Sequence, residues 1–182
     1  MRHIILISGK DSLATAIIQK AKDDTLPYEY VYNPTGAELP EVNTWLTDIE
    51  EYLHATINRV GEDLISIIQN YNFLPSPIAR YCTRKSKIEP LGKYIGKGRG
   101  IATVYYGLRY DEQYRVGYEP IQKSPIIPKY PLREAHMTLP MVWALLDSLK
   151  LLPPMFIWDE MYDRVKVLLG DNSEILENLR PW

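Results

Sequence analysis

Short apolar runs alternate along the chain with longer stretches in which apolar residues recur three and four positions apart. The short runs are rich in β-branched and aromatic residues and predict strands at residues 3–7, 28–32, 55–60 and 101–106. The longer stretches predict amphipathic helices at residues 13–20, 40–54, 62–71, 85–95, 139–151 and 156–169. Residues 107–137 contain four prolines and are predicted to be loop-rich.

The alternation of strands and helices predicts an α/β fold, a three-layer, Rossmann-like sandwich in which helices cover a mostly parallel sheet. We expect a single domain over residues 1–170 and a polar C-terminal tail over residues 171–182. In such folds, ligands bind at the carboxyl ends of the strands. Polar segments follow predicted strands or lie in long loops at residues 8–12, 33–38, 80–87 and 107–115. The sequence therefore predicts one shared cleft.

Composition narrows the functional classes without pointing to a substrate. The 182 residues are 46% hydrophobic and 24% charged, with a net charge of −2, so no global basic field favours nucleic acid. No apolar run reaches the length of a membrane-spanning helix and no secretory pattern opens the sequence, so we expect a cytoplasmic protein. The single cysteine, Cys82, excludes an internal disulfide and an all-cysteine metal site within one chain.

The segment between the first strand and the first helix has the chemistry of an anion site. It reads Ser8, Gly9, Lys10, Asp11 and Ser12. Free N–H groups and the helix dipole attract anions at such a junction, and Lys10 adds a full positive charge. The spacing of a Walker A loop is absent. A plain turn followed by a helix cap would select the same residue types, so both interpretations stay open here.

Two further segments concentrate charge. Arg80, Arg84, Lys85 and Lys87 stand at a predicted helix start, where cations oppose the dipole, which favours a nearby anion over a merely solvated helix start. After the fourth strand, Arg109 and Arg115 are suited to bind phosphate or sulfate, and Glu112 to orient one of them or to hold Mg²⁺ through water. A surface ion-pair cluster is the alternative for this second segment.

Several single residues have two open interpretations. Asp11 is either a helix-capping carboxylate or a metal ligand. Cys82 is either a nucleophile, activated by neighbouring arginines, or a small buried residue. The three histidines, at positions 3, 54 and 136, show no metal-ligand spacing and are expected to be structural.

Taken together, these segments resemble the phosphoadenosine phosphosulfate (PAPS) reductase family of adenine nucleotide α-hydrolases, the PP-loop ATP pyrophosphatases. Residues 8–12 resemble the family's S-G-G-K-D-S loop, and residues 33–41 its D-T-G-x-E-x-P-E segment. Residues 79–91 resemble its R-x-C-T…K-x-x-P-L segment, and residues 107–115 its G-x-R-x-x-E-S-x-R loop. Tyr130-Pro131-Leu132 and the helix with Trp143 resemble a later stretch.

The resemblance implies that the chain binds an adenine nucleotide. The first loop would hold a pyrophosphate or phosphosulfate through Ser8, Gly9, Lys10, Asp11 and Ser12. Thr35 and Gly36 would approach the nucleotide, and the anion would be surrounded by Arg80, Lys87, Arg109 and Arg115. The implied cofactors are ATP or PAPS with Mg²⁺, for which Asp11 is the candidate ligand. Iron–sulfur members need several cysteines, so we expect no cluster.

These implications lead to three functional hypotheses. The first is ATP pyrophosphatase or adenylyl-transfer chemistry, with catalytic roles for Lys10, Arg109, Glu112 and Arg115. The second is a sulfonucleotide reductase or sulfur-transfer enzyme using Cys82, although the reductases use a C-terminal Glu-Cys-Gly-type segment and this chain has no cysteine after Cys82. The third is a non-catalytic nucleotide-binding module. The second substrate stays unknown, and a homodimer is one option for the oligomeric state.

Overall fold

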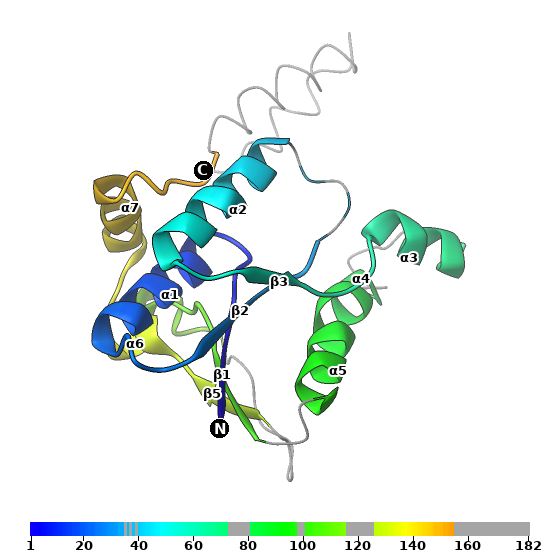
Figure 1. Ribbon diagram of the computed structural model, residues 1–182, viewed down its shortest axis with the longest axis horizontal. Coiled ribbons are helices and arrows are strands. Elements are labelled where there is room, and N and C mark those ends of the chain that lie inside the picture. Colours follow the sequence, from blue (N-terminus) through cyan, green and yellow to red (C-terminus); the bar gives the residue numbers. More distant parts are fainter. Residues whose placement is uncertain are drawn as a thin grey trace, which may run out of the picture.

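Five parallel strands form the central sheet, in the order β3-β2-β1-β4-β5. The computed structural model describes residues 1–34, 36, 38, 40–72, 81–97, 101–115 and 126–154. The strands are β1 (Arg2–Leu6), β2 (Tyr28–Tyr32), β3 (Ile57–Arg59), β4 (Ala102–Tyr105) and β5 (Ile126–Lys129). Figure 1 shows helices on both sides of this sheet, which confirms the predicted three-layer α/β fold.

Seven α-helices connect and cover the strands in the described part of the chain. They are α1 (Lys10–Lys22), α2 (Pro40–Leu53), α3 (Leu64–Tyr71), α4 (Tyr81–Thr83), α5 (Glu89–Lys97), α6 (Pro131–Glu134) and α7 (Leu139–Ser148). A π-helical turn, η1 (Arg84–Ile88), precedes α5, and a 3-10 turn, η2 (Tyr110–Glu112), follows β4. No helix in these ranges is long and apolar enough to cross a membrane.

The sheet separates two apolar cores because successive residues of a strand point to opposite faces. On one face, Ile5 packs with Leu13 of α1, Ile49 of α2 and Leu146 of α7. On the other face, Ile4, Val31 and Val104 of the strands pack with Leu91 and Ile95 of α5. Helices α1 and α5 therefore lie on opposite faces of the sheet, as Figure 1 also shows.

A fifth strand, β5, lies in the region that the sequence predicted to be loop-rich. It pairs with β4, with Pro128 opposite Val104. Proline breaks the sequence pattern of a strand because it lacks an N–H donor, yet an edge strand tolerates it. Because β5 is the outermost strand, the proline that concealed it in the sequence is compatible with its position in the sheet.

The predicted continuous helix over residues 85–95 is divided in the structure, and Pro90 gives the physical reason. A proline removes one helical hydrogen bond, and its ring clashes with the carbonyl four residues earlier, which is Ser86 here. The chain forms the wider π-helical turn η1 immediately before Pro90 and then continues as α5. The predicted helix 156–169 and the tail 171–182 lie outside the described residues, and the single-domain assignment stays a prediction.

Candidate functional site

The loop between β1 and α1 is closed by its own serine. The N–H groups of Ser8 and Gly9 donate to Ser12 Oγ at 2.8 and 3.0 Å, and this hydroxyl donates to the Gly9 carbonyl at 2.8 Å. The first helical bond of α1 runs from the Leu13 N–H to the same carbonyl, at 3.0 Å. The donors available to an anion are therefore those that precede this bond, on Lys10, Asp11 and Ser12.

Lys10 extends from the first turn of α1 toward α7. Its Nζ lies 5.5 Å from the ring centroid of Trp143 and 3.4 Å from Asp11 Oδ2. The side chain is 27% exposed, so the ammonium group keeps access to solvent. The long distance to Asp11 makes this a loose ion pair, which leaves the charge of Lys10 able to attract an anion.

Arg109 is surrounded by carboxylates and is only 12% exposed. Its Nη1 donates to Asp11 Oδ2 at 2.7 Å and its Nε donates to Asp111 Oδ1 at 2.9 Å, while Nη2 lies 3.6 Å from Glu112 Oε1. Burial tends to lower the pKa of this guanidinium, but the three carboxylates, Asp11 most of all, together outweigh burial and raise it. The sequence left two roles open for this segment, anion binding and an ion-pair cluster. The contacts of Arg109 are those of an ion-pair cluster.

Asp11 therefore connects the first turn of α1 to the loop after β4. Its Oδ2 is bound by Arg109 and faces Lys10, whereas its Oδ1 is buried without a hydrogen-bond partner in the described part of the chain. Neither predicted role, helix cap or metal ligand, matches these contacts. Within the described ranges, no group of three His, Cys, Asp or Glu side chains is arranged to hold a metal ion.

Gly107 brings the two segments into backbone contact. A Cβ atom on this residue would lie 2.7 Å from both the Asp11 carbonyl carbon and the Ser12 nitrogen. Real Cβ atoms do not approach backbone this closely, so only glycine fits without a shift of the loop. The glycine of the sequence motif thus has a physical reason, which is the packing of the loop after β4 against the start of α1.

Glu112 is buried within the same loop. Its Oε2 accepts the Arg109 N–H at 3.2 Å and its Oε1 accepts from Arg115 Nη1 at 2.9 Å. Burial tends to raise the pKa of this carboxyl, but these two donors outweigh burial and lower it. Glu112 orients Arg115, as the sequence suggested. Because Arg115 is 51% exposed, its guanidinium stays accessible.

Arg133 is a residue of this region that the sequence analysis missed. It lies on α6, and its Nη2 donates to the Glu112 carbonyl at 2.8 Å and to the Arg115 carbonyl. Its guanidinium carbon lies 5.5 Å from the ring centroid of Tyr130. Arg133 directly follows the Tyr130-Pro131-Leu132 stretch of the family resemblance, which could have drawn attention to it. The carbonyl groups that it binds could not be predicted from the sequence.

The segment after β2 turns toward the end of β3. Asn33 Nδ2 donates to the Val60 carbonyl at 2.7 Å. Gly36 has φ of +74°, and a Cβ there would lie 2.5 Å from Asp63 Cβ. Glu38 accepts from the Gly36 N–H at 2.8 Å and from the Tyr32 hydroxyl at 2.9 Å. Burial, followed by this hydrogen bond, raises the pKa of Tyr32. Thr35 lies outside the described residues.

The basic segment 80–87 forms mainly surface ion pairs. Lys85 Nζ donates to Glu89 Oε2 at 2.7 Å, and Arg84 Nε lies 3.5 Å from Glu89 Oε1. Because Glu89 balances the charges of Arg84 and Lys85, no bound anion is needed to account for these cations at the start of a helix. Lys87 is exposed and has no ion pair within the described ranges, and Arg80 lies outside them. Cys82 is partly buried.

The structure thus brings together two of the four predicted segments by direct contact. Residues 8–12 and 107–115 meet through Asp11, Arg109 and Gly107. Residues 33–38 contact the end of β3 instead, through Val60 and Asp63. Between the described parts of segments 8–12 and 80–87, no hydrogen bond or ion pair is formed. The single cleft predicted from the sequence stays a prediction for the remaining segments.

Comparison with known proteins identifies the fold. No protein-family model matches the sequence, and no curated protein matches it. Among solved structures, the chain is similar to a PAPS reductase from Candida auris in complex with phosphate, with 17% identity and a TM-score of 0.64 over 89% of this chain and 79% of that one. It is also similar to the U34-tRNA thiolase NcsA from Methanococcus maripaludis with its [4Fe-4S] cluster, with 13% identity and a TM-score of 0.59 over 95% and 67%.

At the level of the fold, these similarities confirm the resemblance drawn from the sequence motifs, because the chain shares the fold of this PAPS reductase and of this tRNA thiolase. They also correct the cofactor prediction. The exclusion of an iron–sulfur cluster does not hold for this fold, because the similar thiolase carries one. The prediction of Mg²⁺ at Asp11 does not fit the described residues, because Asp11 Oδ2 is bound by Arg109 and no metal-ligating group surrounds it.

Proposed function

We propose that this chain binds the phosphate groups of an adenine nucleotide at the N-terminus of α1 and transfers an adenylyl group from ATP to an acceptor. In this reaction, an acceptor atom forms a bond to the α phosphorus, the bond between the α phosphorus and the bridging oxygen breaks, and pyrophosphate leaves. The observation that carries the proposal is the junction of a helix N-terminus with the accessible ammonium group of Lys10.

The described residues support distinct roles in this reaction. Lys10 and the first N–H groups of α1 would stabilise the negative charge that develops on the leaving pyrophosphate. Arg115, half exposed and oriented by Glu112, would approach the same anion from the loop after β4. Arg109 would act as a positioning residue, because its charge is already bound by Asp11 and Asp111.

The comparisons support the binding of an anion by proteins of this fold, but they do not specify the reaction. The similar PAPS reductase was solved as a phosphate complex, which agrees with a phosphate-binding role for this fold. The same neighbour and the tRNA thiolase favour a second candidate function, sulfonucleotide reduction or sulfur transfer. In this chain, such a reaction would depend on Cys82, its single cysteine.

Product analysis distinguishes these functions. The purified protein would be incubated with α-labelled ATP, supplied as its magnesium salt, and candidate acceptors. Formation of labelled AMP or an adenylated acceptor supports adenylyl transfer. Release of sulfite from PAPS with reduced thioredoxin, lost in Cys82→Ser, supports the second candidate instead. Tight binding of either nucleotide without turnover would indicate a non-catalytic binding module.

Binding of the nucleotide is tested by Lys10→Ala. Loss of one charged hydrogen bond weakens affinity by about 1.5–3 kcal/mol, which is roughly ten- to a hundredfold in Kd. Calorimetric titration with ATP measures the effect. Lys22→Ala is the matched control, since Lys22 is an exposed lysine at the opposite end of the same helix. Equal affinities for the wild type and Lys10→Ala would contradict the assigned phosphate site.

A further inference from the structure

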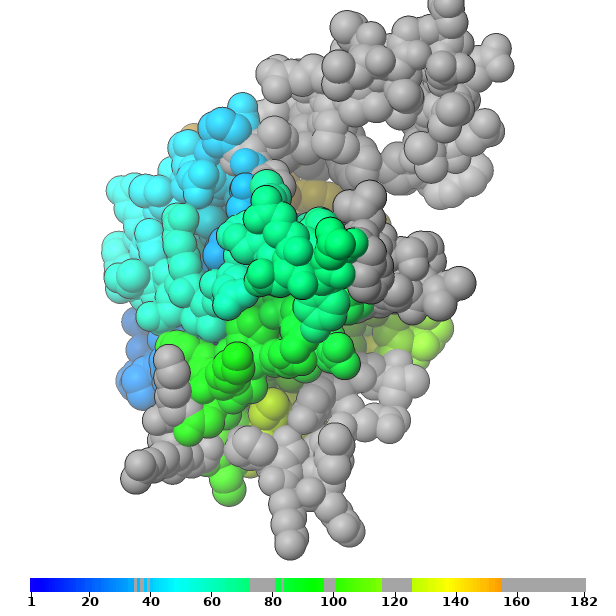
Figure 2. All heavy atoms as spheres, turned by 90° about the vertical axis from the view of Figure 1, so that its right-hand side faces the viewer, coloured from blue at the N-terminus to red at the C-terminus, as the bar shows by residue number. Residues whose placement is uncertain are grey.

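A cavity of about 670 Å³ lies between the sheet edge at β3 and the helical segment formed by α3, η1 and α5. We call it the β3–α5 groove. Figure 2 shows this face of the molecule, where α3 lies above η1 and α5. Because α1 packs on the opposite face of the sheet from α5, the groove is separate from the phosphate site proposed at the start of α1. Its volume falls within the range of small-molecule sites.

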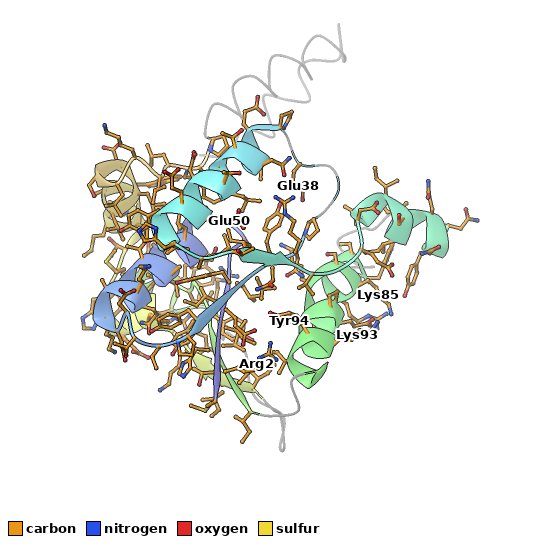
Figure 3. The ribbon with its side chains drawn as sticks, viewed as in Figure 1. Arg2, Glu38, Glu50, Lys85, Lys93 and Tyr94 are labelled. Atoms are coloured by element: carbon orange, nitrogen blue, oxygen red, sulfur yellow. The ribbon has the colours of Figure 1, made fainter. Side chains whose placement is uncertain are left out.

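The floor of the groove contains a cluster of apolar side chains. Ile67 is almost completely buried, and Val60, Pro90 and Tyr94 are half buried beside it. The Tyr94 hydroxyl donates to Glu29 Oε2 at 2.9 Å, so the ring has a fixed position. Figure 3 shows Tyr94 between α5 and the sheet. Such a floor is suited to the apolar or planar body of a ligand rather than to a bare ion.

The rim of the groove is basic. Arg59, Lys85 and Lys93 line it from β3, η1 and α5. Lys85 is bound to Glu89, but Arg59 and Lys93 form no ion pair with any described residue. Within the described ranges, the side-chain hydrogen bond of Arg59 is a long one, 3.4 Å, to Asn43 Oδ1. Neither cation has a carboxylate within ion-pair distance in the described part of the chain, although the charge of Lys93 acts on Glu89, so both can attract an anion in the groove.

The acidic residues of the groove do not cancel this charge. The Lys85 hydrogen bond, opposed by burial, lowers the pKa of Glu89, so this carboxylate is ionised, and it is shared among the charges of Lys85, Arg84 and Lys93. Glu62 is exposed on the rim and is the acidic lining residue without an ion pair among the described residues. The lining cations Arg59, Lys85 and Lys93 therefore outnumber the two lining carboxylates, Glu62 and Glu89.

We propose that the β3–α5 groove is a second ligand site that binds an organic phosphate monoester. The apolar body of the ligand lies on the floor beside Tyr94 and Ile67, and its phosphate lies at the rim with Arg59 and Lys93. A phosphate monoester fits because its oxygens can accept hydrogen bonds from Arg59 and Lys93, neither of which forms an ion pair with a described residue. The groove adjoins the segment after β2, since Asn33 binds the Val60 carbonyl, so its ligand lies two strands from the loop after β1.

Equilibrium dialysis of the full chain with phenyl phosphate tests the site. We expect saturable binding that weakens at least about tenfold in Arg59→Glu and in Lys93→Glu, because each removes one charged contact and adds repulsion. Both side chains are exposed, so these changes leave the core intact. Lys22→Glu is the matched control, because it makes the same charge change on an exposed lysine outside the groove.

Two further arms separate this site from the proposed nucleotide site and from binding of a bare anion. Lys10→Ala should leave phenyl phosphate binding unchanged, whereas loss of binding in this variant alone would place the ligand at α1 and overturn the proposal. Inorganic phosphate should bind more weakly than phenyl phosphate, and equal affinity would reject a role for the apolar floor. Absence of saturable binding, or binding insensitive to both groove variants, also overturns the proposal.

Discussion

Arg109 shows how tertiary contacts decide the role of a charged side chain. The sequence places it in a motif that implies anion binding, yet its guanidinium is bound by Asp11 and Asp111 and lies near Glu112. A cation held in this way contributes chiefly to the position of the loop, whereas Lys10 and Arg115 keep exposed charge for a ligand. The motif thus contains both positioning and ligand-facing residues.

Arg109→Ala should destabilise the fold by about 1.5–3 kcal/mol, the typical effect of removing a partner from buried charged hydrogen bonds. The reason is that the carboxylate of Asp11 loses its shortest contact while its other oxygen is already unpartnered. Urea unfolding monitored by tryptophan fluorescence measures the change. Arg84→Ala is the control, because this 59% exposed arginine forms only a surface ion pair and should change stability by at most about 1 kcal/mol. Equal effects of the two substitutions would contradict the positioning role.

The loop after β4 is held by three helices rather than by its own sequence. It packs on the start of α1 at Gly107, its Tyr110 N–H donates to the Met137 carbonyl, and Asp111 accepts the Leu139 N–H at the start of α7. Arg133 of α6 binds its carbonyl groups. The position of Arg115 therefore depends on elements that follow it by about twenty residues in the chain.

Gly107→Ala tests this packing. The added Cβ would contact the backbone of Asp11 and Ser12 at 2.7 Å, so we expect a loss of about 1–3 kcal/mol and weaker nucleotide binding as the loop shifts. Gly92→Ala is the opposite control: nothing lies within 4 Å of a Cβ in this α5 position, and alanine should stabilise the helix by about 0.5–1 kcal/mol. Thermal unfolding with and without ATP measures both effects. A neutral Gly107→Ala would show that the loop does not need this close contact.

Two hydrogen-bonded acidic residues, the partly buried Glu29 and the buried Glu112, connect distant parts of the molecule and make its stability depend on pH. Glu29 binds Arg2 by two hydrogen bonds, of 2.7 and 2.6 Å, and Tyr94 by a third, which joins β1, β2 and α5. The Arg2 hydrogen bond, opposed by burial, lowers the pKa of Glu29, and donors likewise lower that of Glu112. A lowered folded-state pKa gives stability that is present above the unfolded-state value, 4.5, and is lost as the pH falls through the folded-state value.

We therefore expect the free energy of unfolding to fall as the pH decreases from about 5 to 3. Glu112→Gln should reduce this dependence, because glutamine keeps the shape of the side chain but does not titrate. Urea midpoints measured across this interval give the slope. Glu51→Gln, at an exposed position, should leave the slope unchanged. Identical slopes for Glu112→Gln and the wild type would show that the contacts of Glu112 do not contribute to acid unfolding.

The amino-acid pattern was sufficient for the α/β class, four of the five described strands and the order of the motifs. These features are local, because a strand or helix is encoded by the spacing of apolar residues within a few turns. The pattern missed β5, since Pro128 is unfavourable in a strand except at an edge, and edge position is a property of the assembled sheet.

The tertiary structure alone decided which charges meet and which stay free. Asp11 and Arg109 are distant in sequence but form a 2.7 Å contact, because adjacent parallel strands end at the same edge of the sheet. Arg133 acquired partners that no local pattern encodes. The same assembly left Arg59 and Lys93 together beside an apolar floor. Pairing of side chains depends on three-dimensional distance, whereas spacing along the chain specifies only the element that carries each of them.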